Sequence, residues 1–325
     1  MIKIAMTKAL SDNAMEYLKQ FAEPIIINET EPEKVIEMIN EVDALIFRGN
    51  KVIDNSFFEK MKLLGCKVYA KHGTGLDGID LNSATYYGIP VVYAPGANSR
   101  SVAEYTVAAI LSIIKKIPQC TEKSRNKDNS YRWSYLSKQF KGMTVYIIGF
   151  GNIGREVADM CIGLGMKVQA YDKYVNSKQM QEKGVKYIEK LVDGLNCADI
   201  VTLHTPLTEE TDNLANAEFF NLMKKGSYFV NTARPELMDE AELVKRLNEG
   251  WLAGAVLDAS SIEKGESVTG LESAKNLILS CHIAAMTSDA LDTMGYDCID
   301  GIIAVLNGKR WLKTANKDVY DRLGW

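Results

Sequence analysis

Short apolar runs alternate with amphipathic stretches through the first hundred residues. Runs such as Ile2–Met6 and Ala44–Phe47 have the length and the β-branched content of buried strands. The stretch between them places Met15, Leu18 and Phe21 on one side at helical spacing. This alternation predicts a parallel sheet with helices on its faces. The predicted strands of this half are Ile2–Met6, Pro24–Ile27, Ala44–Phe47 and Lys67–Ala70, and the predicted helices are Asn13–Phe21, Glu33–Ile39 and Ser56–Leu64.

A second strand–helix series begins at Met143. A long helix is predicted before it over Ser99–Lys116, with Pro118 as its end. The stretch Gln119–Lys141 is polar and aromatic without a clean period, and we expect an irregular connection there. A final helix is predicted over Ser288–Leu306. The other predicted elements are strands at Thr144–Ile148, Lys167–Tyr171, Asp199–Leu203, Tyr228–Asn231, Ala253–Leu257 and Leu277–Leu279, and helices at Asn152–Gly163, Glu218–Leu222 and Glu240–Asn248.

Length and composition indicate an ordinary globular protein. A chain of 325 residues predicts two domains. A net charge of −4 argues against a nucleic-acid-binding protein or a basic protein of the membrane surface. No apolar run approaches the ~18 residues of a membrane span, and the N-terminus does not resemble a signal peptide. Six scattered cysteines without a CxxC pair predict reduced thiols in the cytoplasm, and three histidines without HExxH predict no metal site.

The glycine-rich sequence after the predicted strand Thr144–Ile148 predicts a dinucleotide site. Gly149, Gly151 and Gly154 form a GxGxxG motif between that strand and a predicted helix. Gly149 permits the tight turn, Gly151 lets the backbone approach a pyrophosphate, and Gly154 lets the helix pack closely on the strand. The helix N-terminus then offers free N–H groups to the phosphates.

Asp172 predicts which dinucleotide binds. It ends the next predicted strand, about 20 residues beyond the glycine motif, where an acidic side chain binds the ribose 2′-hydroxyl. A carboxylate there repels the 2′-phosphate of NADP, although Lys173 beside it weakens this preference. The sequence therefore predicts NAD as the cofactor.

Three polar residues each follow a predicted strand of the second series. They are Arg234, Glu263 and His282, and strand ends in such sheets converge on the ligand crevice. A guanidinium binds a carboxylate in bidentate fashion and polarises the neighbouring carbonyl. An imidazolium can donate a proton as hydride reaches the carbonyl carbon, and a carboxylate beside it favours that charged form. The set favours reduction of a 2-oxo acid.

Motifs along nearly the whole chain resemble those of the D-isomer-specific 2-hydroxyacid dehydrogenases. That family includes phosphoglycerate dehydrogenases, D-lactate dehydrogenases and hydroxypyruvate or glyoxylate reductases. The matching segments are Lys71–Asp80, Gly88–Val92, Ala94–Ser99, Val102–Glu104, the glycine-rich loop, Leu203–Thr208, Asn231–Arg234, Leu257–Asp258 and His282–Ala285.

The resemblance implies an α/β architecture of two Rossmann-like or flavodoxin-like doubly wound parallel sheets with an active-site cleft between them. Residues 1–98 plus 291–325 would form a flavodoxin-like substrate domain, and residues 99–290 the NAD-binding Rossmann domain. The implied protein is a cytoplasmic homodimer. It would interconvert a D-2-hydroxy acid and its 2-oxo acid with NAD, using His282 as general acid/base, Glu263 to tune that histidine and Arg234 to bind the carboxylate.

The resemblance also implies individual ligand contacts. Thr74 and Gly75 would hold the substrate carboxylate, together with Arg234 and His282. Asp258 would contact the nicotinamide carboxamide. The full set of implied cofactor contacts is Gly149, Gly151, Asn152, Ile153, Gly154, Asp172, Thr205, Pro206, Thr232, Ala233, Arg234, Asp258 and His282.

Several positions depart from the family pattern. Pro235 stands where the family usually has Gly, Cys281 where it has Pro, and Asn152 where it often has His. The segment 259–264 lacks the usual Pro after the glutamate. These changes keep the three chemical groups and alter the walls around them, so the identity of the acid stays open.

Some assignments have alternatives. Glu263 lies in a charged segment in which Glu266 is the other candidate for its role. Arg48, Lys71 and Arg100 are candidates for binding a second anionic group such as a phosphate, with plain surface charge as the alternative.

Two other functions fit the same scaffold. Formate or phosphite oxidation is one, but formate enzymes of the family pair their histidine with Gln, so Glu263 disfavours formate. The other is a non-catalytic NAD(H)-sensing interaction protein like the family's transcriptional corepressors. The intact Arg–Glu–His set and the lack of further tails disfavour it.

Overall fold

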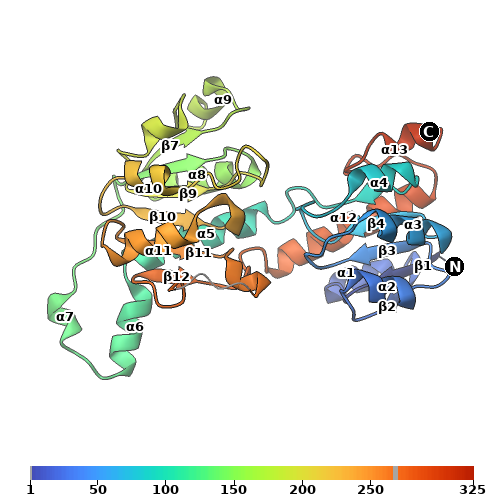
Figure 1. Ribbon diagram of the computed structural model, residues 1–325, viewed down its shortest axis with the longest axis horizontal. Coiled ribbons are helices and arrows are strands. Elements are labelled where there is room, and N and C mark those ends of the chain that lie inside the picture. The colour runs from blue at the N-terminus through green and yellow to red at the C-terminus, as the bar shows by residue number, and fades with distance from the viewer. Residues whose placement is uncertain (1, 266–269) are drawn as a thin grey trace. The chain divides into compact units, whose positions relative to one another are not determined.

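The computed structural model describes residues 2–265 and 270–325 and divides into two compact units (Figure 1). The first unit joins Met1–Asn98 to Met286–Trp325, and the second unit is Ser99–Ala285. Each unit has its own parallel sheet. The two sheets confirm the predicted α/β class and are described one at a time.

The first unit is built on five parallel strands in the order β2-β1-β3-β4-β5. This is the flavodoxin-like order, in which the chain reverses direction across the sheet between β1 and β3. The strands are β1 (Ile2–Met6), β2 (Ala22–Ile26), β3 (Ala44–Phe47), β4 (Val68–Lys71) and β5 (Val91–Val92), and the helices are α1 (Asp12–Leu18), α2 (Pro32–Met38), α3 (Asn55–Leu63), α4 (Leu81–Tyr86), α12 (Ser288–Leu306) and α13 (Val319–Arg322).

Helices cover both faces of this sheet, because successive strand residues point to opposite sides. Ile4 and Met6 lie in one apolar core, which includes Ile299 of α12. Ala5, between them, lies in the other core with Phe58 of α3. Two apolar faces therefore fix the register of β1.

Helix α12 belongs to the first unit from its first turn. Thr287 caps it by accepting a hydrogen bond from the Ala290 N–H, and Ala290 and Met294 pack against Ala94 of the same unit. The chain therefore returns to the first unit at Met286, whereas we expected the return at residue 291.

Within the described residues, no helix combines the length and the apolar character that a membrane span requires.

The second unit is built on seven parallel strands in the order β12-β11-β10-β9-β6-β7-β8. Counted from β6, this is the Rossmann order with one further strand, and the sheet reverses between β6 and β9. The strands are β6 (Thr144–Ile148), β7 (Lys167–Tyr171), β8 (Lys186–Tyr187), β9 (Ile200–Leu203), β10 (Tyr228–Asn231), β11 (Gly254–Leu257) and β12 (Leu277–Leu279), and the α-helices are α5 (Ser99–Ile114), α6 (Ile117–Arg125), α7 (Tyr131–Ser134), α8 (Asn152–Gly163), α9 (Ser177–Gln181), α10 (Ala217–Leu222) and α11 (Glu240–Asn248).

Two cores again sandwich the sheet of the second unit. Val145 and Ile147 of β6 pack with α5 and α8, whereas Tyr146 and Ile148 pack with α10 and α11 on the opposite face. Both faces of the doubly wound sheet are therefore buried, as the apolar character of its strands predicts.

The stretch between α5 and β6 corrects the sequence analysis. We expected an irregular connection over Gln119–Lys141, but α6 and α7 lie there and stand away from the sheet of their unit (Figure 1). Pro118 does not end the long helix as predicted, because α5 already ends at Ile114. It occupies the first turn of α6, where its missing N–H has no partner to lose. Lys116, with φ of 48°, makes the break between α5 and α6.

His72 is a buried histidine in the loop after β4. Its backbone N–H donates to the carbonyl of Phe47 at 3.0 Å, and its Nε2 has no hydrogen-bond partner within the described residues. Burial, with the charge of Arg48 as the second cause, lowers the pKa of His72 to about 4. The ring is therefore neutral near pH 7.

This depressed pKa predicts an acid-sensitive first unit. The unfolded chain binds the proton near pH 6.5 and the folded chain only near pH 4, so the contribution of His72 to stability is present above about pH 6.5 and is lost as the pH falls through 4. We expect a loss of about 3 kcal/mol from this group, on the scale of 1.36 kcal/mol per pKa unit. Urea unfolding at several pH values measures it. His72→Gln should flatten the pH dependence of the free energy of unfolding between pH 6.5 and 4, and parallel curves for the two proteins would contradict the assignment.

Candidate active site

Six strands of the second unit end along one line at the carboxyl edge of the sheet. The residues paired across this line, from β7 to β12, are Tyr171, Ile148, Leu203, Asn231, Leu257 and Leu279. Every predicted site residue of this unit lies in a loop or at a helix start just after the line. The register of the sheet therefore collects residues that are up to about 130 positions apart in the sequence at one edge.

The glycine-rich loop after β6 has the shape that a dinucleotide site requires. A Cβ atom at Gly149 would lie 2.6 Å from the backbone carbonyl of His204, and one at Gly154 would collide with the carbonyl oxygen of Gly149. A Cβ atom at Gly151 would meet no atom within 4 Å, so open space lies beside this residue at the start of α8. Arg155 braces the loop by donating from Nε to the carbonyl of Phe150 at 3.0 Å.

Asp172 is anchored at the end of β7 by three backbone amides. Its Oδ2 accepts a hydrogen bond from Phe150 of the glycine-rich loop at 2.7 Å. Its Oδ1 accepts from Tyr174 at 2.8 Å and from Val175 at 3.0 Å. The carboxylate is therefore fixed beside the glycine-rich loop.

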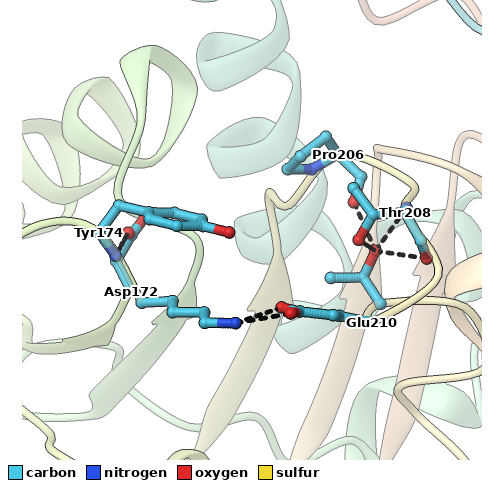
Figure 2. Close-up of polar contacts among 7 residues, drawn as sticks. Asp172, Tyr174, Pro206, Thr208 and Glu210 are labelled. Atoms are coloured by element: carbon cyan, nitrogen blue, oxygen red, sulfur yellow. Dashed lines mark hydrogen bonds and ion pairs between the residues drawn. The ribbon is translucent and has the colours of Figure 1, made fainter.

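The loop after β9 faces Asp172 and is held in shape by Thr211. The hydroxyl of Thr211 donates to the carbonyl of Pro206 at 2.7 Å and accepts from the N–H of Thr208 at 2.8 Å (Figure 2). The Oγ1 of Thr205 is buried and has no hydrogen-bond partner within the described residues, which leaves a polar group available to a bound molecule. Burial lowers the pKa of His204 to about 3, so this ring stays neutral, and its Nε2 lies 2.9 Å from the hydroxyl of Thr202.

Asn231 shapes the loop that carries Arg234. Its buried side chain accepts a hydrogen bond from the N–H of Ala233 at 3.0 Å and donates to the carbonyl of Arg234 at 2.7 Å. Pro235 then opens the 3₁₀ helix η2 (Pro235–Leu237), so a proline suits the position where the family usually has Gly. The loop places Arg234 three residues beyond the end of β10.

Asp258 holds the segment that carries His282. Its carboxylate accepts hydrogen bonds from the N–H groups of Ile283 at 3.0 Å and Ala284 at 2.8 Å, and from the hydroxyl of Ser280 at 2.6 Å. Its carbonyl accepts from the N–H of His282 at 2.8 Å. His282 has φ of 57°, a conformation that costs free energy for a residue with a side chain and persists where its surroundings impose it. Asp258 supplies those surroundings.

Helix α5 contributes two side chains that the sequence analysis missed. The hydroxyl of Tyr105 lies 2.5 Å from that of Ser280, and the hydroxyl of Thr106 lies 3.0 Å from that of Thr232. Both residues belong to a helix whose apolar pattern predicts only packing. Polar groups within its buried face were the signal that could have identified them.

Glu263 is only partly described. Its backbone lies in the 3₁₀ helix η3 (Ser261–Lys264), whereas its side chain and the whole of Glu266 lie outside the described residues. The start of η3 is tied to Glu240, another residue that the sequence analysis missed. The buried carboxylate of Glu240 accepts from the N–H of Ser261 at 2.8 Å and from its hydroxyl at 2.5 Å.

The predicted substrate-binding residues Thr74 and Gly75 lie in the first unit, in the loop after β4. Lys71, at the end of β4, is buried, and its Nζ donates to the carbonyl of Gly49. Arg48 follows β3, and its Nη2 lies 3.8 Å from the sulfur of Met286. These residues gather at the carboxyl edge of the first sheet.

Arg100, the third candidate for binding a second anion, has carboxylate partners in the second unit. Its Nε lies 2.6 Å from Glu104, and its Nη1 lies 3.1 Å from Glu156. Two carboxylates balance its charge, which disfavours Arg100 as a residue that binds a second anion.

The second unit fits a dinucleotide. It has open space at Gly151, an anchored carboxylate at Asp172 and the unsatisfied hydroxyl of Thr205 along one edge. Among residues 2–265 and 270–325, no group of three His, Cys, Asp or Glu side chains is arranged to hold a metal ion.

Comparison with known proteins identifies the kind of domain that the second unit forms. Residues 107–284 match the sequence model of the NAD binding domain of D-isomer specific 2-hydroxyacid dehydrogenases. The match covers most of the second unit and confirms the prediction of an NAD-binding domain there.

Two relatives illustrate the range of similar sequences. The chain is 32% identical over 308 residues to a D-3-phosphoglycerate dehydrogenase of Archaeoglobus fulgidus, a match that covers 94% of this chain and only 58% of that longer protein. It is 30% identical over 328 residues to a glyoxylate reductase of Thermococcus litoralis, with 98% of this chain and 97% of the relative covered.

Solved structures show the same fold. A D-2-hydroxyisocaproate dehydrogenase matches with a TM-score of 0.85 and 25% identity, over 97% of this chain and 100% of the other. A D-lactate dehydrogenase of Lactobacillus jensenii, solved with NAD⁺, matches with a TM-score of 0.81 and 26% identity, over 97% and 99% of the two chains. The chain therefore belongs to the D-isomer specific 2-hydroxyacid dehydrogenase family.

Proposed function

We propose that this protein is an NAD-dependent dehydrogenase that interconverts a D-2-hydroxy acid and the corresponding 2-oxo acid. The observation that carries the proposal is the Asp258 network, which fixes His282 at the same sheet edge as the glycine-rich loop and Asp172. A proton donor and a dinucleotide site on one edge are what hydride transfer to a carbonyl requires.

Each proposed catalytic residue has one chemical task. When bound, NADH supplies the hydride that reaches the carbonyl carbon of the 2-oxo acid. The imidazolium of His282 donates a proton to the carbonyl oxygen, and in the reverse direction the neutral ring takes that proton back. Arg234 binds the substrate carboxylate and polarises the carbonyl, and Glu263 favours the charged form of His282. We propose that Thr74 and Gly75, in the loop after β4, bind the substrate through their backbone.

A substrate panel tests this function. We expect NADH oxidation, followed by its absorbance, with at least one of glyoxylate, hydroxypyruvate, pyruvate or 2-ketoisocaproate. The panel includes phosphorylated 2-oxo acids, because Arg48 and Lys71 lie at the sheet edge near Thr74. His282→Gln should lower kcat about 10²–10⁴-fold, the usual contribution of a general acid, and should keep its affinity for NADH. NADH binding without turnover on any acid, or full turnover by the variant, would contradict the proposal.

Asp258 provides a second test, because we propose that its carboxylate positions His282. Asp258→Asn replaces one acceptor oxygen by an NH₂ group, so at least one of the hydrogen bonds from Ile283, Ala284 or Ser280 is lost. We expect kcat to fall about 10–100-fold, and hydrogen exchange to show faster exchange of the amides of residues 283 and 284.

The matched control is Asp199→Asn. Asp199 accepts from the N–H of Thr144 at the opposite, amino edge of the sheet. That variant should lose stability and keep kcat. An equal loss of kcat in both variants would show that the substitutions act through folding, and it would contradict the proposal that Asp258 positions His282.

We also propose that the protein is a homodimer and that α6 and α7 form its contact. Neither helix has a buried residue, and Trp133 and Leu136 are 84% and 85% exposed. Polar contacts nevertheless hold the end of this segment. The Nζ of Lys115 donates to the carbonyl of Lys138 at 2.7 Å and lies 5.4 Å from the centre of the Phe140 ring. An ordered projection with exposed aromatic and aliphatic side chains favours a protein contact, and a second copy of the chain is the proposed occupant.

Light scattering after size-exclusion chromatography tests the dimer. We expect a mass of two chains for the wild type and of one chain for Trp133→Asp/Leu136→Asp. Leu312→Asp is the matched control, because Leu312 is 87% exposed and lies in the first unit. A monomeric wild type, or dissociation by the control variant, would exclude this contact.

The cysteines support a cytoplasmic location, which we also propose. All six are free, and Cys66, Cys161 and Cys298 are buried. Free thiols of this kind are typical of reducing compartments.

A further inference from the structure

The edge of the proposed adenosine site carries an ion pair that the sequence analysis did not foresee. Lys173 follows Asp172 after β7, and its Nζ lies 2.6 Å from both carboxylate oxygens of Glu210 in the loop after β9 (Figure 2). The pair joins the two sides of the site, because Asp172 and Tyr174 lie on one side and Pro206, Thr208 and Glu210 on the other.

Hydrogen bonds within the loop after β9 hold Glu210 in position. Thr211, the next residue, bonds to both Pro206 and Thr208 through its hydroxyl, and its own N–H donates to the carbonyl of Thr208 at 3.0 Å. This closed turn holds the backbone of Glu210 opposite Lys173. Asp172 is held as firmly by its three backbone amides.

The charges at this edge bear on which dinucleotide binds. A ribose 2′-hydroxyl meets an acceptor at Asp172, whereas a 2′-phosphate meets a negative charge there and needs a cation to compensate it. Lys173 is the cation beside Asp172 in the sequence, and its ammonium group is already engaged with a carboxylate.

We propose that Glu210 is a specificity-determining residue that selects the dinucleotide without a 2′-phosphate. It does so by keeping the ammonium group of Lys173 engaged, so that no free cation lies at the edge where a 2′-phosphate would lie. The inference rests on the proposed dinucleotide site of the second unit and deepens it, since it assigns the discrimination to a residue of the loop after β9.

Glu210→Gln tests the inference by releasing Lys173. We expect the Kd for NADPH to fall about three- to tenfold, in line with the modest strength of charge interactions at exposed positions, and the Kd for NADH to change less than twofold. Both constants come from fluorescence titration of the protein with each reduced cofactor, so the test does not require a known acid substrate.

Two further variants make the result specific. Glu209→Gln removes the same charge from the neighbouring exposed residue and should leave the ratio of the two Kd values unchanged. Lys173→Met added to Glu210→Gln should cancel the gain in NADPH affinity, because the released ammonium group is its source.

The outcomes separate this inference from the function on which it rests. Tight NADH binding with an unchanged NADPH affinity in Glu210→Gln would overturn the role of Glu210 and leave the dinucleotide site standing. The same gain in Glu209→Gln, or a gain that survives the loss of Lys173, would also overturn it. Failure of the wild type to bind either cofactor would overturn both the inference and the dinucleotide site.

Discussion

The hydrogen-bonded register of the seven parallel strands in the second unit is the constraint on which its site depends. Because β7, β6, β9, β10, β11 and β12 end in line, their following loops all begin at one edge. A shift of one strand by a single residue would turn its apolar side chains from one core into the other. The two buried cores therefore fix the register, and the register fixes where Gly149, Asp172, Arg234 and His282 lie.

Anchored polar side chains convert this common edge into defined loop shapes. Asp172, Asn231, Asp258 and Glu240 each accept hydrogen bonds from backbone N–H groups of a loop at the edge. Loops at a sheet edge carry backbone groups that the strands do not satisfy, and these acceptors satisfy them. In this way one carboxylate, Asp258, both completes the hydrogen bonding of residues 283 and 284 and keeps His282 at a positive φ.

Much of the fold and part of the site could be predicted from the sequence. The apolar runs predicted the central strands of both sheets because these are buried on two faces, but they did not predict the two-residue strands β5 and β8. The glycine motif stands out because close packing at Gly149 and Gly154 excludes any Cβ atom. The α6–α7 segment could not be predicted in this way, since it buries no residue against its unit and so has no apolar period. The interpretation of Pro118 as a helix end was wrong there as well, because a proline suits the first turn of a helix as well as the end of one.

The sequence by itself determined most strands of the two sheets, the glycine-rich loop and the family, because periodicity, glycine spacing and motif residues are local properties of the chain. Only the tertiary structure decided which polar groups meet: Lys173 with Glu210, Tyr105 with Ser280, and Asp258 with the segment of His282. These partners come from different strands and helices, so no spacing along the chain encodes them. They meet because the sheet register and the helix packing bring the ends of separate elements to the same place.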